Sequence, residues 1–293
     1  MDFADILLKR LDGENELKKP IKALICFSKP KTGVALGKLI VDIVKAKAER
    51  SSVTALNLID EEQAAEIEDE VLYKTQLFSE LVDRCEKNKV SIRTFVKKSD
   101  DFVNDILAMA KELDCNLILL GIGNQILTPV LWEKYAKIKD SNSEELPQKT
   151  GKYGLRGVST LLMRNPVSTG IFVESNFRSP GQIFTPLLHK DDVSIFPYLF
   201  QMAKLPYVKA TVWDAIGIID SDQKVQKIFQ YIKKKTDDRV ALWDNNKKID
   251  AEFIQKQDLI MIGITGWERL IGSAIPWLNS LPSTLIIKDD SKT

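Results

Sequence analysis

The sequence predicts an α/β protein built from two similar units, each a five-stranded parallel sheet with helices on both faces. The first observation is an internal repeat, in which residues 114–124 (DCNLILLGIGN) are echoed by residues 258–266 (DLIMIGITG). In both copies a short apolar run ends in glycines, as a buried parallel strand does where it enters a turn. The second observation is that short apolar runs alternate with helical apolar spacing, which is typical of parallel sheets with right-handed crossovers. A chain of 293 residues has room for two such units.

The first unit follows an amphipathic segment at residues 1–19, which is expected to be a connector. An acidic stretch at 60–70 is expected to open a long helix, and Ser99-Asp-Asp101 to cap another. A brief helix is expected at 157–164, after a long loop whose pattern lapses. The expected strands are 23–27, 53–59, 90–96, 117–120 and 167–173. The long helix is expected to bury a stripe of Ile67, Val71, Phe78, Leu81, Val82 and Cys85.

The second unit repeats this pattern in a shorter form. A helix between its second and third strands carries apolar residues at helical spacing, namely Val225, Ile228, Phe229 and Ile232. The expected strands are 183–188, 209–213, 239–243, 259–262 and 284–287. We therefore divide the chain into a connector (1–19), a first unit (20–176, with an insertion near 125–156) and a second unit (177–293).

The exposed edges of the two fifth strands, at 167–173 and 284–287, are expected to pair with each other inside one molecule. Such pairing would make the tandem an intramolecular pseudo-dimer, and the chain is also a candidate for a homodimer. In open parallel sheets a ligand binds at the carboxyl ends of the strands where their order reverses. That crevice is expected between the first and fourth strands of each unit.

Composition and charge exclude several classes of function. A formal net charge of +1 provides no field to gather nucleic acid, so no nucleic-acid partner is expected. Cys26, Cys85 and Cys115 lack the spacing of metal ligands and are expected to be buried thiols of a reducing compartment. No apolar run is long enough for a membrane span, and no secretion signal is present. The chain as given is expected to be soluble and cytosolic.

Catalytic motifs are missing as well. The single histidine, His189, has no nucleophile and orienting group of recognisable spacing, and neither a Gly-x-Ser-x-Gly elbow nor a Walker loop occurs. We therefore expect a protein that is not an enzyme and holds no metal.

Two segments resemble the universal stress protein family. They are residues 97–124 (KKSDDFVNDILAMAKELDCNLILLGIGN) and residues 157–173 (GVSTLLMRNPVSTGIFV). The resemblance extends over residues 20–175 and, more weakly, 180–289. It implies tandem universal-stress-protein-like units, for which ATP or another adenine nucleotide is the expected ligand.

In nucleotide-binding members of that family, an aspartate ends the first strand near the adenine, and glycine loops wrap the phosphates with backbone N–H groups. Ser28 stands at the aspartate's position in the first unit, and Leu188 in the second. The glycines have an alternative explanation, because a tight strand-to-helix turn also requires glycine. The cofactor-binding residues that the resemblance implies are Ser28, Gly121, Gly123, Asn124, Gly157 and Ser159 in the first unit and Gly263, Gly266, Gly272 and Ser273 in the second.

A narrower resemblance concerns the starts of the two units. Residues 21–44 (IKALICFSKPKTGVALGKLIVDIV), 51–60 (SSVTALNLID) and 182–200 (QIFTPLLHKDDVSIFPYLF) are similar to the cytoplasmic C-terminal region of bacterial monovalent cation:proton antiporters. This resemblance implies a regulatory domain at the inner face of the bacterial membrane, with a transmembrane antiporter part as its partner. Residues 1–19 would then be the tether, and Met1 an added or internal start. The alternative is a freestanding tandem universal stress protein that binds adenine nucleotide.

Overall fold

The structure is a computed structural model, which describes residues 20–45, 51–123, 158, 160–162, 165, 167–273 and 275–289. The predicted connector at 1–19 and the insertion at 125–156 lie outside the described residues, and so does part of the brief helix predicted at 157–164.

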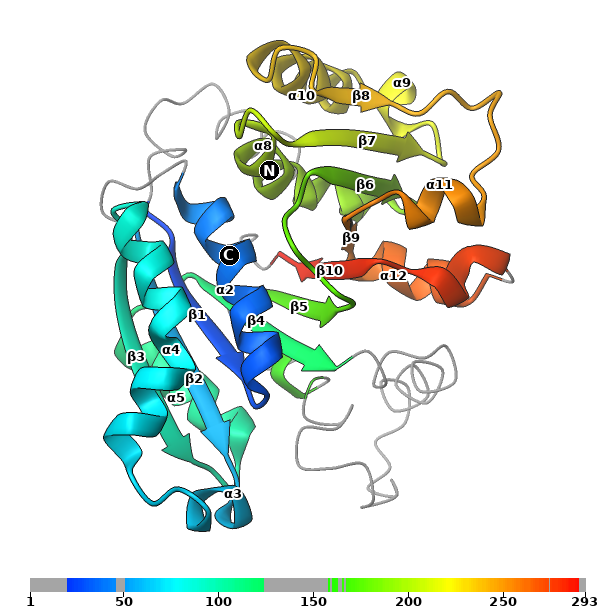
Figure 1. Ribbon diagram of the computed structural model, residues 1–293. Coiled ribbons are helices and arrows are strands. Elements are labelled where there is room, and N and C mark those ends of the chain that lie inside the picture. The colour runs from blue at the N-terminus through cyan, green and yellow to red at the C-terminus, as the bar shows by residue number, and fades with distance from the viewer. Residues whose placement is uncertain are drawn as a thin grey trace.

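All ten predicted strands are present among the described residues, with ends that shift by a few positions. They are β1 Lys22–Phe27, β2 Ser52–Ile59, β3 Ser91–Lys98, β4 Leu117–Gly123, β5 Ser168–Glu174, β6 Gln182–Leu187, β7 Lys209–Asp214, β8 Val240–Leu242, β9 Leu259–Gly263 and β10 Ser283–Lys288. These strands form one sheet in the order β3-β2-β1-β4-β5-β10-β9-β6-β7-β8 (Figure 1). Every neighbouring pair among them is parallel except β5 and β10, which are antiparallel.

Helices connect the strands and cover both faces of the sheet. In the described part of the chain they are α2 Pro30–Val44, α3 Glu61–Ala65, α4 Glu70–Lys87, α5 Phe102–Glu112, α8 Phe196–Ala203, α9 Ile218–Ser221, α10 Gln223–Lys235, α11 Ala251–Gln255 and α12 Ile264–Ile271, with the 3-10 helices η3 Lys190–Ile195 and η4 Pro276–Ser280. Aspartate caps start several of them: the side chain of Asp101 accepts from the N–H of Asn104, as predicted, and that of Asp222 accepts from Val225.

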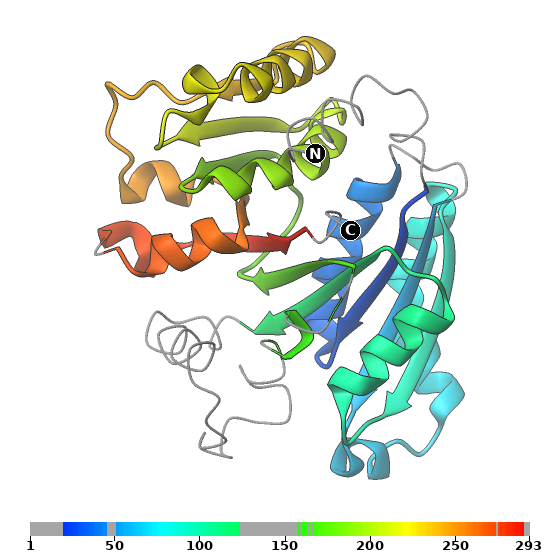
Figure 2. The ribbon, with the colours of Figure 1, turned by 180° about the vertical axis from the view of Figure 1, so that it is seen from behind.

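The strands divide the core into two layers, because successive side chains point to opposite faces. On β1, Ile25 and Phe27 belong to the layer under α2, α4, α8 and α10, whereas Leu24 and Cys26 belong to the layer under α5, α11 and α12. Figures 1 and 2 view these two helix layers from opposite sides of the sheet. Each layer contains residues of both units, so the two units are packed together on both faces of the sheet.

The two units are joined edge to edge, as the sequence predicts for the fifth strands. β5 and β10 pair in antiparallel register, with Thr284 opposite Val173 and Ile287 opposite Gly170. A Cβ added at Gly170 would lie 2.4 Å from the Leu119 Cδ2 atom, so this junction accepts no larger residue without movement.

A buried polar cluster also links the units beside the sheet. The Asp42 carboxylate on α2 is fully buried and contacts Lys45 Nζ at 2.7 Å, Arg84 Nη2 at 3.3 Å and the Tyr207 hydroxyl at 3.0 Å. Tyr207 belongs to the second unit, between α8 and β7. Because a buried carboxylate needs such partners, this cluster fixes α2 against the second unit.

Our prediction of a single long helix after residue 60 is wrong. The chain forms α3, capped by Asp60, and then starts again as α4, whose first turn is capped by Asp69. The acidic residues thus act as two separate caps, and the restart turns the first turn of α4 away from the core. Val71 is consequently 76% exposed, although we predicted it within the buried stripe.

Candidate functional site

The carboxyl ends of β1 and β4 meet at the reversal of strand order in the first unit, where a crevice is expected; we call this place the first crevice. Ser28 follows β1 directly and is half-buried. The amide of Asn57, a fully buried residue of β2, donates to the carbonyl oxygens of Phe27 and Ser28 at 3.1 and 3.3 Å. The Tyr73 hydroxyl in turn donates to Asn57 Oδ1 at 3.1 Å. This network fixes the backbone at the end of β1.

Gly121 and Gly123 belong to a strand and not to the loop that we predicted. β4 continues through Gly121 and Gly123, which stand in register with Phe172 and Glu174 of β5. A Cβ at Gly121 would lie 2.6 Å from the Thr32 Cγ2 atom. Gly121 therefore allows the first turn of α2 to approach β4, which is a packing role. The remaining predicted residues of this site, Asn124, Gly157 and Ser159, lie outside the described residues.

The corresponding place in the second unit, at the carboxyl ends of β6 and β9, is occupied by a buried carboxylate; we call it the second crevice. Asp192 on η3 has no exposed surface. Its Oδ2 atom accepts from the backbone N–H groups of Leu188 and His189, both at 2.8 Å, and its Oδ1 atom accepts from Gly266 N at 2.9 Å. Gly266 is in the first turn of α12, whose capping residue, Gly263, has no side chain to offer. The carboxylate therefore caps α12 from 74 positions away in the chain.

The two predicted glycines of this crevice surround that carboxylate. A Cβ at Gly263 would lie 2.4 Å from Asp192 Oδ1, and a Cβ at Gly266 would lie 2.2 Å from Asp192 Oδ2. Burial raises the pKa of Asp192 to about 6, while the three backbone N–H donors act in the opposite direction by favouring the charged form. Glycine at these positions thus makes room for a side chain of the protein itself.

The structure does not bring the later Gly-Ser pair to the same place. Gly272 and Ser273 end α12, where the Ser273 hydroxyl donates to the Leu270 carbonyl oxygen. Gly263 and Gly266 are at the start of that helix, and eight residues of helix span about 12 Å. The pair therefore terminates a helix at the end remote from the carboxylate.

The two crevices are equivalent but not identical. Thr32 stands five positions beyond the end of β1 and touches Gly121, just as Asp192 stands five positions beyond the end of β6 and touches Gly263. The first unit thus places a neutral hydroxyl and methyl group where the second places a carboxylate. Sequence reasoning missed Asp192. The signal available in the sequence was the repeat itself: when the end of β1, Phe27, is aligned with the end of β6, Leu187, Thr32 corresponds to Asp192.

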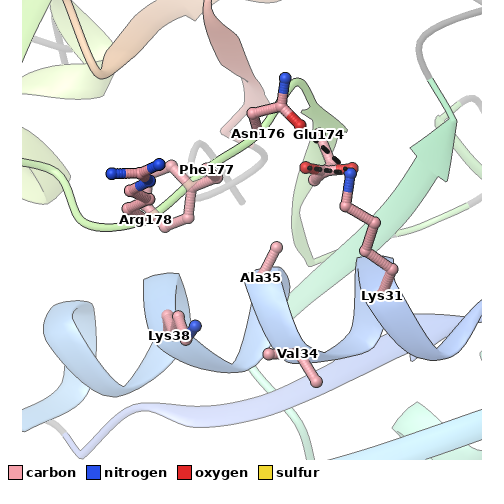
Figure 3. A pocket seen from close by; sticks show the side chains of 8 residues that line it. All are labelled: Lys31, Val34, Ala35, Lys38, Glu174, Asn176, Phe177 and Arg178. Carbon is pink, nitrogen blue, oxygen red and sulfur yellow. Dashed lines mark hydrogen bonds and ion pairs between the residues drawn. The ribbon is translucent and has the colours of Figure 1, made fainter.

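A separate pocket lies where the connection from β5 to β6 passes over α2 (Figure 3). This cavity of about 480 Å³ is lined by Lys31, Val34, Ala35, Lys38, Glu174, Asn176, Phe177 and Arg178. Lys31 reaches from α2 to Glu174 and Asn176, at 3.6 and 3.3 Å, and Lys38 pairs with Glu80 at 3.0 Å. Two of the three cations that line this pocket are thus paired with carboxylates.

The other candidate side chains have structural surroundings. His189 Nδ1 accepts from the N–H of Asp191 at 3.2 Å, and Trp267 and Trp277 are buried. The three cysteines are free and buried, and no cluster of metal-ligating residues occurs among the residues that the structure describes. Within the same residues, no helix combines the length and the apolar character needed to cross a membrane.

Comparisons with known proteins support the fold. No protein-family model matches the sequence, and no curated protein is significantly similar to it. A solved structure described as a universal stress protein from Pseudomonas aeruginosa UCBPP-PA14 shares 15% identity with a TM-score of 0.50, covering 94% of this chain and 96% of that chain. A functionally unknown protein from Pseudomonas aeruginosa PAO1 shares 14% identity with a TM-score of 0.49, covering 94% and 95%.

A universal stress protein in complex with cAMP matches 52% of this chain and 97% of its own, at 12% identity and a TM-score of 0.33. Identities this low bear on the fold alone. The chain has an α/β fold like that of universal stress proteins, with a mostly parallel ten-stranded sheet across the described residues.

Proposed function

We propose that this chain is a non-catalytic regulatory module, and that it forms the cytoplasmic region of a bacterial monovalent cation:proton antiporter. One observation supports the absence of catalysis. Gly121 and Gly263 occupy equivalent positions in the two crevices, and both are packed by the chain's own side chains, Thr32 and Asp192. A site that transfers or hydrolyses a phosphoryl group needs open donors at these places. The antiporter assignment is supported by the resemblance of residues 21–44 and 182–200.

A module of this kind acts by contacting its partner differently in two transporter states, because only differential affinity shifts an equilibrium. The shared core and the Asp42 cluster connect the two units, so we expect a contact made on one unit to act on the other. The expected coupling is of the order of 1–3 kcal/mol, as for other allosteric pairs.

The antiporter assignment is tested on the native polypeptide. An antibody against the purified chain should detect a protein far larger than 33.1 kDa, which stays in the membrane fraction after washing with high salt. In everted vesicles, deleting the codons of this region should then alter the cation-dependent dissipation of a pH gradient. A soluble native protein of the size of this chain would refute the assignment.

The alternative, a freestanding protein that binds adenine nucleotide, is favoured by one observation. In the first crevice Thr32 replaces the carboxylate of the second, and Lys29 and Lys31 lie on the same turn. An anionic ligand therefore meets no fixed negative charge at Thr32. Calorimetric titration with ATP, AMP and cyclic dinucleotides decides this alternative, and a flat trace for all of them at millimolar ligand would remove it.

A further inference from the structure

The start of α12 is an anion-binding position by its chemistry. The N–H groups of a helix's first turn point outwards without intrahelical partners, and the helix dipole favours negative charge there. In the second crevice this position is filled by Asp192, whose carboxylate accepts from the N–H of Gly266 in the first turn of α12.

We propose that Asp192 determines the ligand specificity of the second unit: its carboxylate is a resident anion that holds the place of a ligand's phosphate or carboxylate group. The second unit then accepts no anionic ligand, and any nucleotide that the protein binds is bound by the first unit alone. This inference concerns the second crevice and does not depend on the proposed membrane partner.

The fit of the carboxylate supports this assignment. Both oxygens are used, because Oδ2 closes the turn after β6 and Oδ1 reaches α12. The same oxygens lie where the Cβ atoms of residues 263 and 266 would otherwise be. An incoming anion that reached the Gly266 N–H would have to displace the carboxylate and would be repelled by it until then.

The charged groups around Asp192 do not provide an alternative explanation for its place. On α12, the Arg269 guanidinium donates to the Leu188 carbonyl oxygen at 2.7 Å. At the start of η3, Nδ1 of the capping residue His189 accepts from the N–H of Asp191, and the carboxylate of Asp191 lies 3.3 Å from that same nitrogen. The carboxylate of Asp192 thus accepts from the three backbone N–H groups of Leu188, His189 and Gly266, as a bound oxyanion would.

The proposal predicts a gain of binding when the carboxylate is removed. Asp192→Gly vacates the position, and Asp192→Thr copies the equivalent residue of the first unit. Inorganic phosphate and pyrophosphate are the probes, titrated calorimetrically near neutral pH into folded protein. We expect at least about tenfold tighter binding by either variant than by the parent, a change of about 1.4 kcal/mol.

Two controls localise the gain. In the double variant Asp192→Gly with Gly266→Ala, the new methyl group enters the vacated position, so the gained binding should be lost while the fold is kept. Asp191→Asn removes one charge from the same 3-10 helix but leaves Asp192 in place, and it should bind phosphate like the parent. A folded Asp192→Gly or Asp192→Thr protein that gains nothing would show that the carboxylate is a helix cap only.

The parent protein provides a test that does not depend on the folding of any variant. The backbone amide resonance of Gly266 should not move when phosphate or ATP is added at millimolar concentration. A saturable shift of that resonance would mean that the second crevice takes an anion despite Asp192, and the proposal would be overturned. Because only the second crevice is observed, either result leaves the proposed membrane role to its own test.

Discussion

Replacing Asp192 by asparagine should change how the stability of this protein depends on pH. Burial raises the pKa of this carboxyl group to about 6 in the folded chain, whereas an aspartate in an unfolded chain titrates near about 3.9. Between these two values the folded state binds more protons than the unfolded state. The free energy of unfolding therefore decreases as the pH rises from about 4 to about 6, and the contribution is fully present below the lower value.

The magnitude follows from the difference of about two pKa units. Each unit corresponds to about 1.4 kcal/mol, so the parent should gain about 3 kcal/mol relative to Asp192→Asn as the pH falls from about 7 to about 4. Asparagine does not titrate, so subtracting its unfolding free energy removes the contributions of all other groups that the substitution leaves unchanged.

Urea unfolding, followed by tryptophan fluorescence at a series of pH values, measures this difference. Asp83→Asn, a change of an exposed carboxylate on α4, controls for the loss of one charge. If the parent instead loses stability relative to Asp192→Asn as the pH falls, then the three N–H donors outweigh burial, and our account of this carboxylate is wrong. If the difference in unfolding free energy between the two proteins does not change with pH, the pKa of Asp192 is not raised.

Three further changes test the packing of the two units, each measured by denaturant unfolding. Gly121→Ala should lower the free energy of unfolding by about 1–3 kcal/mol, because its Cβ would lie 2.6 Å from the Thr32 methyl group. Adding Thr32→Ser removes that methyl group and should recover part of the lost stability. If nothing is recovered, the packing role of Gly121 is contradicted. Asp42→Ala should lower the free energy of unfolding by about 2–3 kcal/mol by leaving the half-buried Lys45 and Arg84 without their carboxylate, and Tyr207→Phe by only about 1 kcal/mol; equal effects would argue against a shared cluster. Gly170→Ala should lower the free energy of unfolding by about 1–3 kcal/mol, since its Cβ would lie 2.4 Å from the Leu119 side chain of β4, and an unchanged midpoint would show that Leu119 moves aside without cost.

The sequence by itself determined the ten strands and the joining of the two units. Buried parallel strands are short runs of apolar residues between turn signals, and this pattern is local, so it can be recognised without knowing the partners. The pairing of β5 with β10 followed from one physical requirement, that an exposed strand edge be covered. The ends of the elements were less well determined: β4 continues through Gly123 because β5 provides a partner there.

The break between α3 and α4 was missed because acidic residues were assigned only to the first turn of one helix. Asp60 and Asp69 are both good caps, and the choice between one helix and two depends on which apolar residues find a core to contact. Val71 has the right spacing for burial but is 76% exposed, because no described part of the chain covers it. Helical periodicity predicts a face and not the presence of a surface opposite that face.

The contents of the two crevices were decided by tertiary structure alone. The glycines at 121, 263 and 266 fit a phosphate cradle and a packing contact equally well when only the sequence is read. What distinguishes these roles is the side chain that arrives from far away in the chain, Thr32 in one unit and Asp192 in the other. Asp192 and Gly266 are 74 positions apart, and only the folding of β6 beside β9 brings that carboxylate to the N–H groups it occupies.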